Sequence, residues 1–252
     1  MKKILFVIYA LAASSVLMQC SPKKQEEPIE NNASVTPAAQ LTDEQKAEGW
    51  QLLFDGQTTQ GWQIFKAREN NTWEVVDGTL HCKALDEKVM GVGDKRSDIM
   101  TTAQYDNFEL AFDWKISTQG NTGVMFRVTE EFEQPYYSGP EYQLMDDVGF
   151  PNETPDHLSG SNYGVHAAGK TSLKPTGEWN TSKLVVNKNH VEHWLNGEKL
   201  VDYELNSPEW LALKKASKWN EATGYGAAPK GHIVFQDHGS EAWFRNIMIK
   251  TL

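Results

Sequence analysis

The sequence predicts an all-β domain, a sandwich of two antiparallel sheets. Short segments in which apolar and polar residues alternate fill most of the chain after residue 40, and a period of two is that of a half-buried strand. Turn-forming pairs such as Asp77-Gly78 and Asn196-Gly197 separate these segments at roughly the 8–12-residue spacing typical of sandwiches. Only residues 42–48 and 207–218 look helical, so the chain lacks the helices that a βαβ fold needs.

The first element is a targeting segment. Lys2-Lys3 precede an apolar run, Ile4–Leu17, that is too short to span a bilayer. The run ends in Leu17-Met18-Gln19-Cys20, which resembles a bacterial lipoprotein cleavage box, although Gln19 stands where a small residue is usual. We therefore expect residues 1–19 to be a lipoprotein signal peptide, the alternative being an ordinary signal peptide with an incidental cysteine. Lipidation of Cys20 would anchor the chain to a membrane of the bacterial cell envelope, facing the periplasm or at the outer-membrane surface.

Residues 20–40 are predicted to be a flexible tether, because no apolar run there could offset the entropy of ordering. Residues 41–252 then form one large all-β domain. Loss of Lys2 and Lys3 changes the net charge from −10 to −12, which argues against nucleic acid or anionic lipid as ligand and suits a neutral sugar better. Cys82 has no partner once Cys20 is acylated, so no disulfide is expected.

The domain begins with a short helix and a hairpin. Thr42-Asp43-Glu44-Gln45 has the spacing of a capping box, and the helix should end before Gly49. Leu52-Leu53-Phe54 predicts a short strand that closes in a turn at Asp55-Gly56. Trp73–Cys82 predicts a hairpin, because Asp-Gly between alternating segments is among the strongest short-range turn signals.

Further strands follow from the same alternation. They are Asn107–Ile116, Thr122–Val128, Tyr142–Met145, Ser182–Lys188, His190–Asn196, Lys199–Tyr203, His232–Asp237 and Trp243–Lys250. Two irregular stretches, 129–141 and 147–178, interrupt the series and are rich in Pro, Gly, Asn and aromatic residues. Loops of that length inside a compact domain usually carry function, so we expect the site beside them.

The segment Gly139–Asp146 holds the central candidate residues. Alternation places Glu141 and Gln143 on one face of a strand, and a one-residue bulge would bring Asp146 beside them. A row of carboxylate, amide and carboxylate is costly to bury in a core, so it fits the floor of a cleft. The alternative is a solvated strand face.

A series of short motifs, in order, resembles the bacterial 3-keto-disaccharide hydrolase family. The motifs are Leu53-Phe54-Asp55-Gly56 with Gly61-Trp62, Trp73–Gly78, Asn107–Leu110, Asn121–Arg127, Glu141–Asp146, Gly177–Asn180, His193–Gly197, Gln236–Gly239 and Trp243–Ile247. The resemblance runs from about Leu41 to Leu252. It implies a concanavalin A-like jelly-roll sandwich, and secreted or lipid-anchored proteins that act on glycosides oxidised at C3.

Such a substrate defines the groups that a site would need. A ketone at C3 acidifies the C2 proton, so a base can remove it, the enolate can expel the C1 aglycone, and water can add afterwards. The site needs a base, a cation or donor for the enolate oxygen and an acid for the leaving oxygen. Glu141, Asp146 and His238 are the candidate bases and acids. Arg127 could stabilise the enolate, or it could equally cap the edge of the sandwich.

Sugar binding calls for hydrogen-bonding groups and aromatic rings on which pyranose C–H faces can stack. Gln143, Asn121 and Gln236, all within the motifs above, are the candidate polar contacts. Trp62, Tyr163 and Trp179 flank turns or loops and are the candidate stacking residues.

No cofactor and no metal are predicted. His190 and His193, the histidine pair closest in sequence, should point to opposite strand faces, and no His-x₃-His or Cys-x-x-Cys spacing occurs. A structural Ca²⁺ held by loop oxygens stays open, because oxygen sites leave weak sequence traces.

Two other functions compete with cleavage of 3-keto-glycosides. One is retaining hydrolysis as in β-glucanases of this sandwich class, whose Glu-x-Asp-x-x-Glu row Glu141, Gln143 and Asp146 copy poorly. The other is a glycan-binding surface lipoprotein without catalysis, which would have no use for an acid–base pair.

Overall fold

The computed structural model describes residues 39–85, 95–169 and 172–252. The predicted signal peptide, Cys20 and nearly all of the predicted tether therefore lie outside the described residues. Within the three described ranges, no helix is long and apolar enough to cross a membrane.

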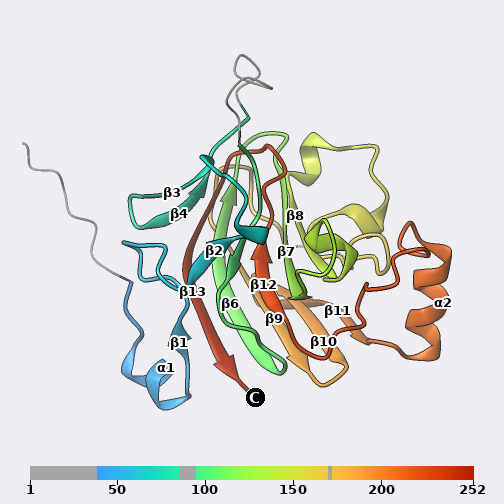
Figure 1. Cartoon of the computed structure of the whole chain (residues 1–252). Helices are drawn as coiled ribbons and strands as arrows, with labels where there is room; N and C mark the ends of the chain where they lie inside the picture. Colours follow the sequence, from blue (N-terminus) through green and yellow to red (C-terminus); the bar gives the residue numbers. More distant parts are fainter. Residues whose placement is uncertain (1–38, 86–94, 170–171) are drawn as a thin grey trace, which may run out of the picture. The chain divides into compact units, whose positions relative to one another are not determined.

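Two antiparallel sheets packed face to face form the domain (Figure 1), so the predicted sandwich is confirmed. The larger sheet runs β11-β10-β9-β6-β13-β4-β3, and β1 also pairs with β13. Its strands are β1 (Gln51–Leu52), β3 (Trp73–Val76), β4 (Thr79–Cys82), β6 (Phe108–Ile116), β9 (Asn180–Asn187), β10 (His190–Leu195), β11 (Glu198–Glu204) and β13 (Ala242–Thr251).

The smaller sheet runs β2-β5-β12-β7-β8. Its strands are β2 (Trp62–Ile64), β5 (Ile99–Thr101), β7 (Asn121–Val128), β8 (Glu141–Met145) and β12 (His232–Phe235). β2 and β5 are short and were not predicted, because three residues are too few to show an alternation.

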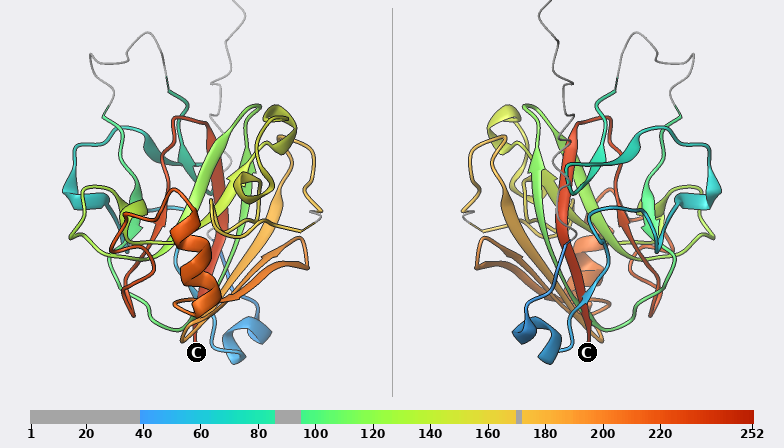
Figure 2. Two further views of the ribbon diagram at one scale, coloured as in Figure 1. Left: turned by 90° about the vertical axis from the view of Figure 1, so that its right-hand side faces the viewer. Right: turned by 90° about the vertical axis from the view of Figure 1, so that its left-hand side faces the viewer.

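The local signals at the start of the domain form the predicted structures. The Thr42 side chain accepts a hydrogen bond from the Gln45 N–H, which completes the capping box of α1 (Asp43–Ala47). Asp77 and Gly78 both have positive φ, 47° and 74°, as the turn between β3 and β4 requires. The second predicted helix is α2 (Pro208–Ala216), and the views in Figure 2 show both helices outside the two layers of strands.

The main core lies between the sheets, where buried aromatic and aliphatic side chains such as Phe112, Tyr142 and Phe235 meet. A second, smaller apolar cluster lies on the outer face of the smaller sheet. It comprises Phe65, Met100, Met125, Val128 and Val234. Phe65 and Tyr136 belong to the 3₁₀ turns η1 (Phe65–Ala67) and η2 (Pro135–Tyr137), and Tyr136 packs against the cluster. This outer face is therefore covered at one end.

Candidate active site

Beside the apolar cluster, the outer face of the smaller sheet carries a cleft of about 250 Å³. Its floor comes from β7, β8 and the residues after β12, and its walls come from η2 and the loops after β8 and α2. The lining residues are Asn121, Tyr136, Glu141, Gln143, Tyr163, Lys218, Trp219, Gln236 and His238. Alternation in β8 explains the floor, because Tyr142 and Leu144 enter the core while Glu141 and Gln143 point outward.

Three amide side chains lie together on this floor. The Gln143 Nε2 donates to Asn121 Oδ1 over 2.9 Å. Gln143 lies opposite Gly123 on β7, and the Gln236 N–H donates to the Gly123 carbonyl over 2.9 Å. Among the described residues, the buried Gln236 Oε1 has no hydrogen-bond partner. An unpartnered buried amide oxygen in a cleft is suited to accept a hydrogen bond from a ligand hydroxyl.

Glu141 is the buried ionisable group of the cleft, with 3% of its surface exposed. Burial raises the pKa of the Glu141 carboxyl to about 8, and the charge of Lys218 opposes this effect only in part. Gly123 provides the space for this side chain, because a Cβ on residue 123 would lie 2.0 Å from Glu141 Oε1. The backbone of β7 and the apolar cluster thus hold a carboxyl group with the basicity that proton transfer near neutral pH requires.

The burial of Glu141 should make the stability of the protein depend on pH. Because the folded pKa of Glu141 is about 8 and its ordinary value 4.5, folded protein binds more protons than unfolded protein between these limits. The free energy of unfolding should therefore fall as pH rises through that window, and the total decrease should be on the order of a few kcal/mol. Glu141→Gln should remove this loss, so its advantage in thermal stability over the native protein should grow from pH 5 to pH 8.

Melting curves of both proteins across this pH range measure the effect. Glu178→Gln, at an exposed position, is the matched control and should melt like the native protein at each pH. A constant difference between Glu141→Gln and the native protein would mean that the Glu141 pKa is ordinary.

Lys218 brings a positive charge to the wall of the cleft. Its Nζ lies 3.9 Å from the centroid of the Tyr163 ring and 4.7 Å from that of Trp219. Burial lowers the pKa of Lys218, while the charges of Glu141, Glu153 and Asp156 raise it. The aromatic rings and the amine thus form one wall, and a sugar ring can stack there while its oxygens face a cation.

His238 completes the rim, and the residue before it takes part in a buried ion pair. Its neighbour Asp237 has a fully buried side chain that accepts hydrogen bonds from Arg96 Nε over 2.9 Å and from the Thr72 hydroxyl over 2.7 Å. The Gly239 N–H also donates to the Asp237 carboxylate over 3.2 Å. The loop after β12 is therefore fixed on both sides of His238.

A comparison with known proteins places the chain in a family. The model of the 3-keto-alpha-glucoside-1,2-lyase-like domain matches residues 49–250. The chain belongs to this family. The resemblance that the motifs indicated is thereby confirmed.

Known relatives of this lyase-like domain agree with the assignment. A 3-keto-disaccharide hydrolase of Bacteroides thetaiotaomicron is 31% identical over 290 aligned positions that cover 100% of both chains. A crystal structure from Parabacteroides distasonis, of a candidate glycosyl hydrolase, is 36% identical with a TM-score of 0.76 and covers 85% of this chain and 99% of its own. A second candidate glycosyl hydrolase from that organism is 26% identical with a TM-score of 0.56, covering 76% and 99%.

The structure of the lyase-like domain corrects the prediction for Asp146. No bulge interrupts the β7–β8 pairing, so Asp146 does not join Glu141 and Gln143. It leaves the strand and accepts hydrogen bonds from the Gln119 N–H over 2.8 Å and the Thr176 hydroxyl over 2.7 Å. Burial raises the pKa of Asp146, but these hydrogen bonds outweigh burial and hold the pKa below its ordinary value. Asp146 thus fastens two loops together outside the cleft.

Arg127 is also outside the cleft. It is buried, has φ of 54° where β7 and β12 shift register, and donates from Nη2 to the carbonyl oxygens of Asp106 and Lys188. Of the two roles left open for Arg127, the structure supports the one at the edge of the sandwich.

Two of the predicted stacking residues are elsewhere as well. Trp62 lies in the core, where its ring packs 5.3 Å from that of Phe235 and its Nε1 donates to the Leu53 carbonyl. Trp179 lies between the cations of Lys115 and Arg245, at 5.2 and 4.0 Å from its ring centroid. Both are near turns in the sequence, but a turn residue can enter the core or lie on the other sheet.

Tyr136, Lys218 and Trp219 line the cleft and were not among the predicted site residues. Lys218 and Trp219 follow α2 and begin an irregular stretch, 217–231, with three glycines, a proline and Tyr225. The same composition marked the loops at 129–141 and 147–178. This stretch could have been included on that signal.

A wider hollow of about 740 Å³ lies elsewhere on the surface, near Phe132, Gly224 and Lys230. Its acidic residues, Glu130 and Glu131, are solvated rather than buried. The smaller cleft is the better candidate, because it combines a buried carboxyl, a cation and aromatic rings.

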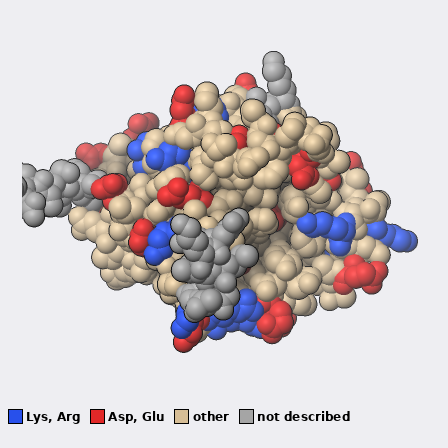
Figure 3. Space-filling model, turned by 90° about the horizontal axis from the view of Figure 1, so that it is seen from above, with Lys and Arg blue, Asp and Glu red and all other residues tan. Residues whose placement is uncertain are grey.

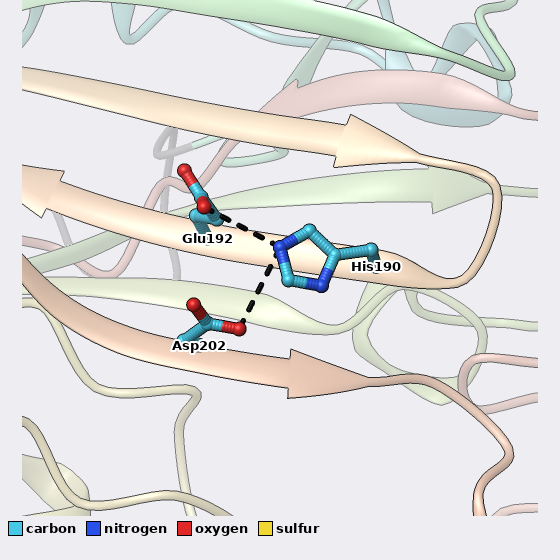
Figure 4. Close-up of side chains that lie close together, drawn as sticks. All are labelled: His190, Glu192 and Asp202. Atoms are coloured by element: carbon cyan, nitrogen blue, oxygen red, sulfur yellow. Dashed lines mark hydrogen bonds and ion pairs between the residues drawn. The ribbon is translucent and has the colours of Figure 1, made fainter.

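Among the described residues, one group has the composition of a metal site. His190, Glu192 and Asp202 place their ligand atoms within 4.8 Å of one another on β10 and β11 (Figure 4). Sequence spacing did not show this group, because Asp202 comes from the neighbouring strand. Lys199 Nζ already lies 3.2 Å from Glu192 and 2.5 Å from Asp202, so a cation would have to displace it. We interpret the group as an ion-pair network.

This network is on the outer face of the larger sheet, away from the cleft. His193 is fully buried whereas His190 is partly exposed, which confirms that the two histidines point to opposite strand faces. On the face of the molecule seen in Figure 3, acidic and basic side chains are interspersed and form no large basic patch.

Proposed function

We propose that the chain cleaves glycosides that carry a ketone at C3, by proton abstraction, elimination and hydration. The observation that carries the proposal is Glu141, a carboxyl buried in a sugar-sized cleft with a pKa of about 8. Membership of the lyase-like family and the relatives among 3-keto-disaccharide hydrolases and glycosyl hydrolases support an activity on glycosidic bonds.

Glu141 acts as the base. Its carboxylate takes the C2 proton, which the C3 ketone has made acidic, and electrons of the C2–H bond move onto the ketone oxygen. A raised pKa makes Glu141 a stronger base than an ordinary carboxylate, and about a tenth of it is ionised at pH 7. The backbone of Gly123 leaves this carboxyl room to face the substrate.

Lys218 stabilises the enolate in place of Arg127, which does not reach the cleft. Lys218 brings a cation to the cleft from an exposed position, and a cation there favours the negative oxygen that develops after proton abstraction. The enolate then expels the C1 oxygen, and His238, at the rim, donates the proton that the leaving group takes up. Water adds at C1 and C2 in the last step and gives the free 3-keto sugar.

The remaining residues hold the sugar. Asn121, Gln143 and Gln236 bind hydroxyl groups along the floor, and Gln236 has an oxygen free for this purpose among the described residues. Tyr136, Tyr163 and Trp219 supply rings for stacking against the pyranose.

The test of this function compares a 3-keto-glucoside with the same glucoside before oxidation. We expect release of 3-keto-glucose from the first and no reaction of the second, because only the ketone acidifies C2. In D₂O, deuterium should appear at C2 of the product or of recovered substrate. Equal rates on both glycosides would contradict elimination, and no reaction with either would favour a glycan-binding protein.

The geometry disfavours the glucanase alternative. Retaining hydrolysis uses two carboxyl groups about 5–5.5 Å apart, one as nucleophile and one as acid. The row that suggested it would need Asp146 beside Glu141, and Asp146 instead bonds Thr176 and Gln119 outside the cleft.

Attachment to the cell envelope completes the proposal. Lipidation of Cys20, predicted from Leu17-Met18-Gln19-Cys20, would keep the enzyme at a membrane surface. The domain would then meet glycosides outside the cytoplasm.

A further inference from the structure

A second carboxyl group lies on the same sheet face as Glu141. Asp98 immediately precedes β5, and because Ile99 pairs with Phe235, the next outward-facing pair is Asp98 with Gln236. The Asp237 N–H donates to Asp98 Oδ1 over 2.7 Å, which fits this register. Gln236 bonds in turn to Gly123, the residue over which the Glu141 carboxyl lies. Asp98 and the Glu141 carboxyl therefore flank Gln236.

The separation of the two groups follows from the sheet. β5 and β7 are two strands apart, so the backbones of Asp98 and Gly123 are roughly 10 Å apart. Asp98 is 8% exposed, so its side chain is largely removed from solvent. Because the Glu141 carboxyl lies over Gly123, the two carboxyl groups are separated by a similar distance. Charges at such a distance in a partly desolvated site interact measurably.

The charged or titratable groups near Asp98 are Asp237 from the loop after β12, Arg68 after η1, Cys82 of β4, Tyr136 of η2 and Glu141 of β8. Burial raises the pKa of Asp98 to about 7, against the effect of the hydrogen bond from Asp237.

The two cations near Asp98 are engaged elsewhere. Arg96 bonds Asp237, and Arg68 Nη2 lies 3.1 Å from Glu133 Oε2. Asp98 therefore has no ion pair of its own among the described residues, although the charge of Arg68 still acts on it from a distance. The charge of Asp98 in turn raises the pKa of Glu141, by less than burial does.

We propose that Asp98 is a positioning residue that sets the charge state of Glu141, so that the two carboxyl groups hold a single negative charge between them near neutral pH. This inference rests on the proposed role of Glu141 as the base. A negative charge on Asp98 favours the protonated form of Glu141, and this makes the Glu141 carboxylate a stronger acceptor for the C2 proton. Through Asp237, Asp98 also holds the loop that presents His238.

The test is a pH titration of the substrate-free protein, with ¹³C-labelled carboxyl groups followed by NMR. The Glu141 signal is assigned by its absence in Glu141→Gln. Asp98→Asn keeps the shape and the acceptor oxygen for the Asp237 N–H but removes the charge. The Glu141 midpoint should fall by about one pH unit in Asp98→Asn, as expected for a like charge at this distance.

Asp55→Asn is the matched control, because Asp55 also accepts backbone hydrogen bonds but lies on the surface, and it should leave the Glu141 midpoint unchanged. An unchanged midpoint in Asp98→Asn would overturn the proposal. If Asp98→Asn does not fold, Asp98→Ser decides instead, because it also removes the charge and keeps a side-chain oxygen, and the Glu141 midpoint should fall in this variant too.

Activity provides a separate readout. The acidic limb of kcat/KM on a 3-keto-glucoside should move with the NMR midpoint in Asp98→Asn, whereas a merely structural role would lower the rate without moving the limb. A protein that shows the NMR coupling but no activity on 3-keto-glucosides would contradict the proposed function and leave the coupling of Asp98 and Glu141 standing.

Discussion

Glu141→Gln is expected to lower kcat on a 3-keto-glucoside by roughly 10²–10⁴-fold and to leave KM within a few-fold. The amide keeps the size and hydrogen-bonding capacity of the side chain but cannot accept the C2 proton. Because the Glu141 pKa is about 8, the native enzyme should also gain activity as pH rises through that value. Steady-state rates and exchange of the C2 proton with deuterium, both measured from pH 6 to pH 9, check these points.

Glu109→Gln is the control for this variant. Glu109 is partly buried, but it lies on the larger sheet, where its Oε1 is 3.1 Å from Lys250 Nζ. Its replacement should therefore leave kcat unchanged. A Glu141→Gln protein that still exchanges the C2 proton at the native rate would exclude Glu141 as the base and leave His238 as the candidate in the cleft.

Lys218→Met should reduce kcat by roughly 10²–10³-fold, the usual size of the loss when a group that stabilises a developing oxyanion is removed. Met keeps the length and the contact with the Tyr163 and Trp219 rings but has no charge. Lys218→Arg keeps the charge and should recover part of the rate. Single-turnover rates with a 3-keto-glucoside separate this chemical step from substrate binding.

Lys215→Met, on the exposed side of α2, is the matched control and should behave as the native enzyme. If Lys218→Met raised KM and left kcat intact, Lys218 would bind the substrate without stabilising the enolate. Native activity in Lys218→Met would remove Lys218 from the mechanism.

The residues predicted from strand alternation are those that the structure places best. Glu141 and Gln143 share an outward face because alternation is a local property of an extended backbone, and it needs no knowledge of the neighbouring strands. Asn121, Gln236 and His238 were included through the family motifs, and they meet Glu141 in the cleft. The predicted bulge before Asp146 is absent, and Asp146 leaves the strand and bonds the loop residue Thr176 instead.

By itself, then, the sequence determined the all-β class, the family and the alternation of β8, and it gave Glu141 as one of three candidate bases or acids. Only the tertiary structure decided what surrounds that carboxyl. Lys218 and Asp98 are far from Glu141 in sequence. The loop after α2 brings Lys218 to the cleft, and the order of the strands in the smaller sheet brings Asp98 near it. Local periodicity encodes neither arrangement. Trp62 and Trp179 were predicted in the cleft because they are next to turns, but Trp62 lies in the core and Trp179 lies on the other sheet. Chemistry in this cleft depends on burial and on neighbouring charge, and both are properties of the packed chain.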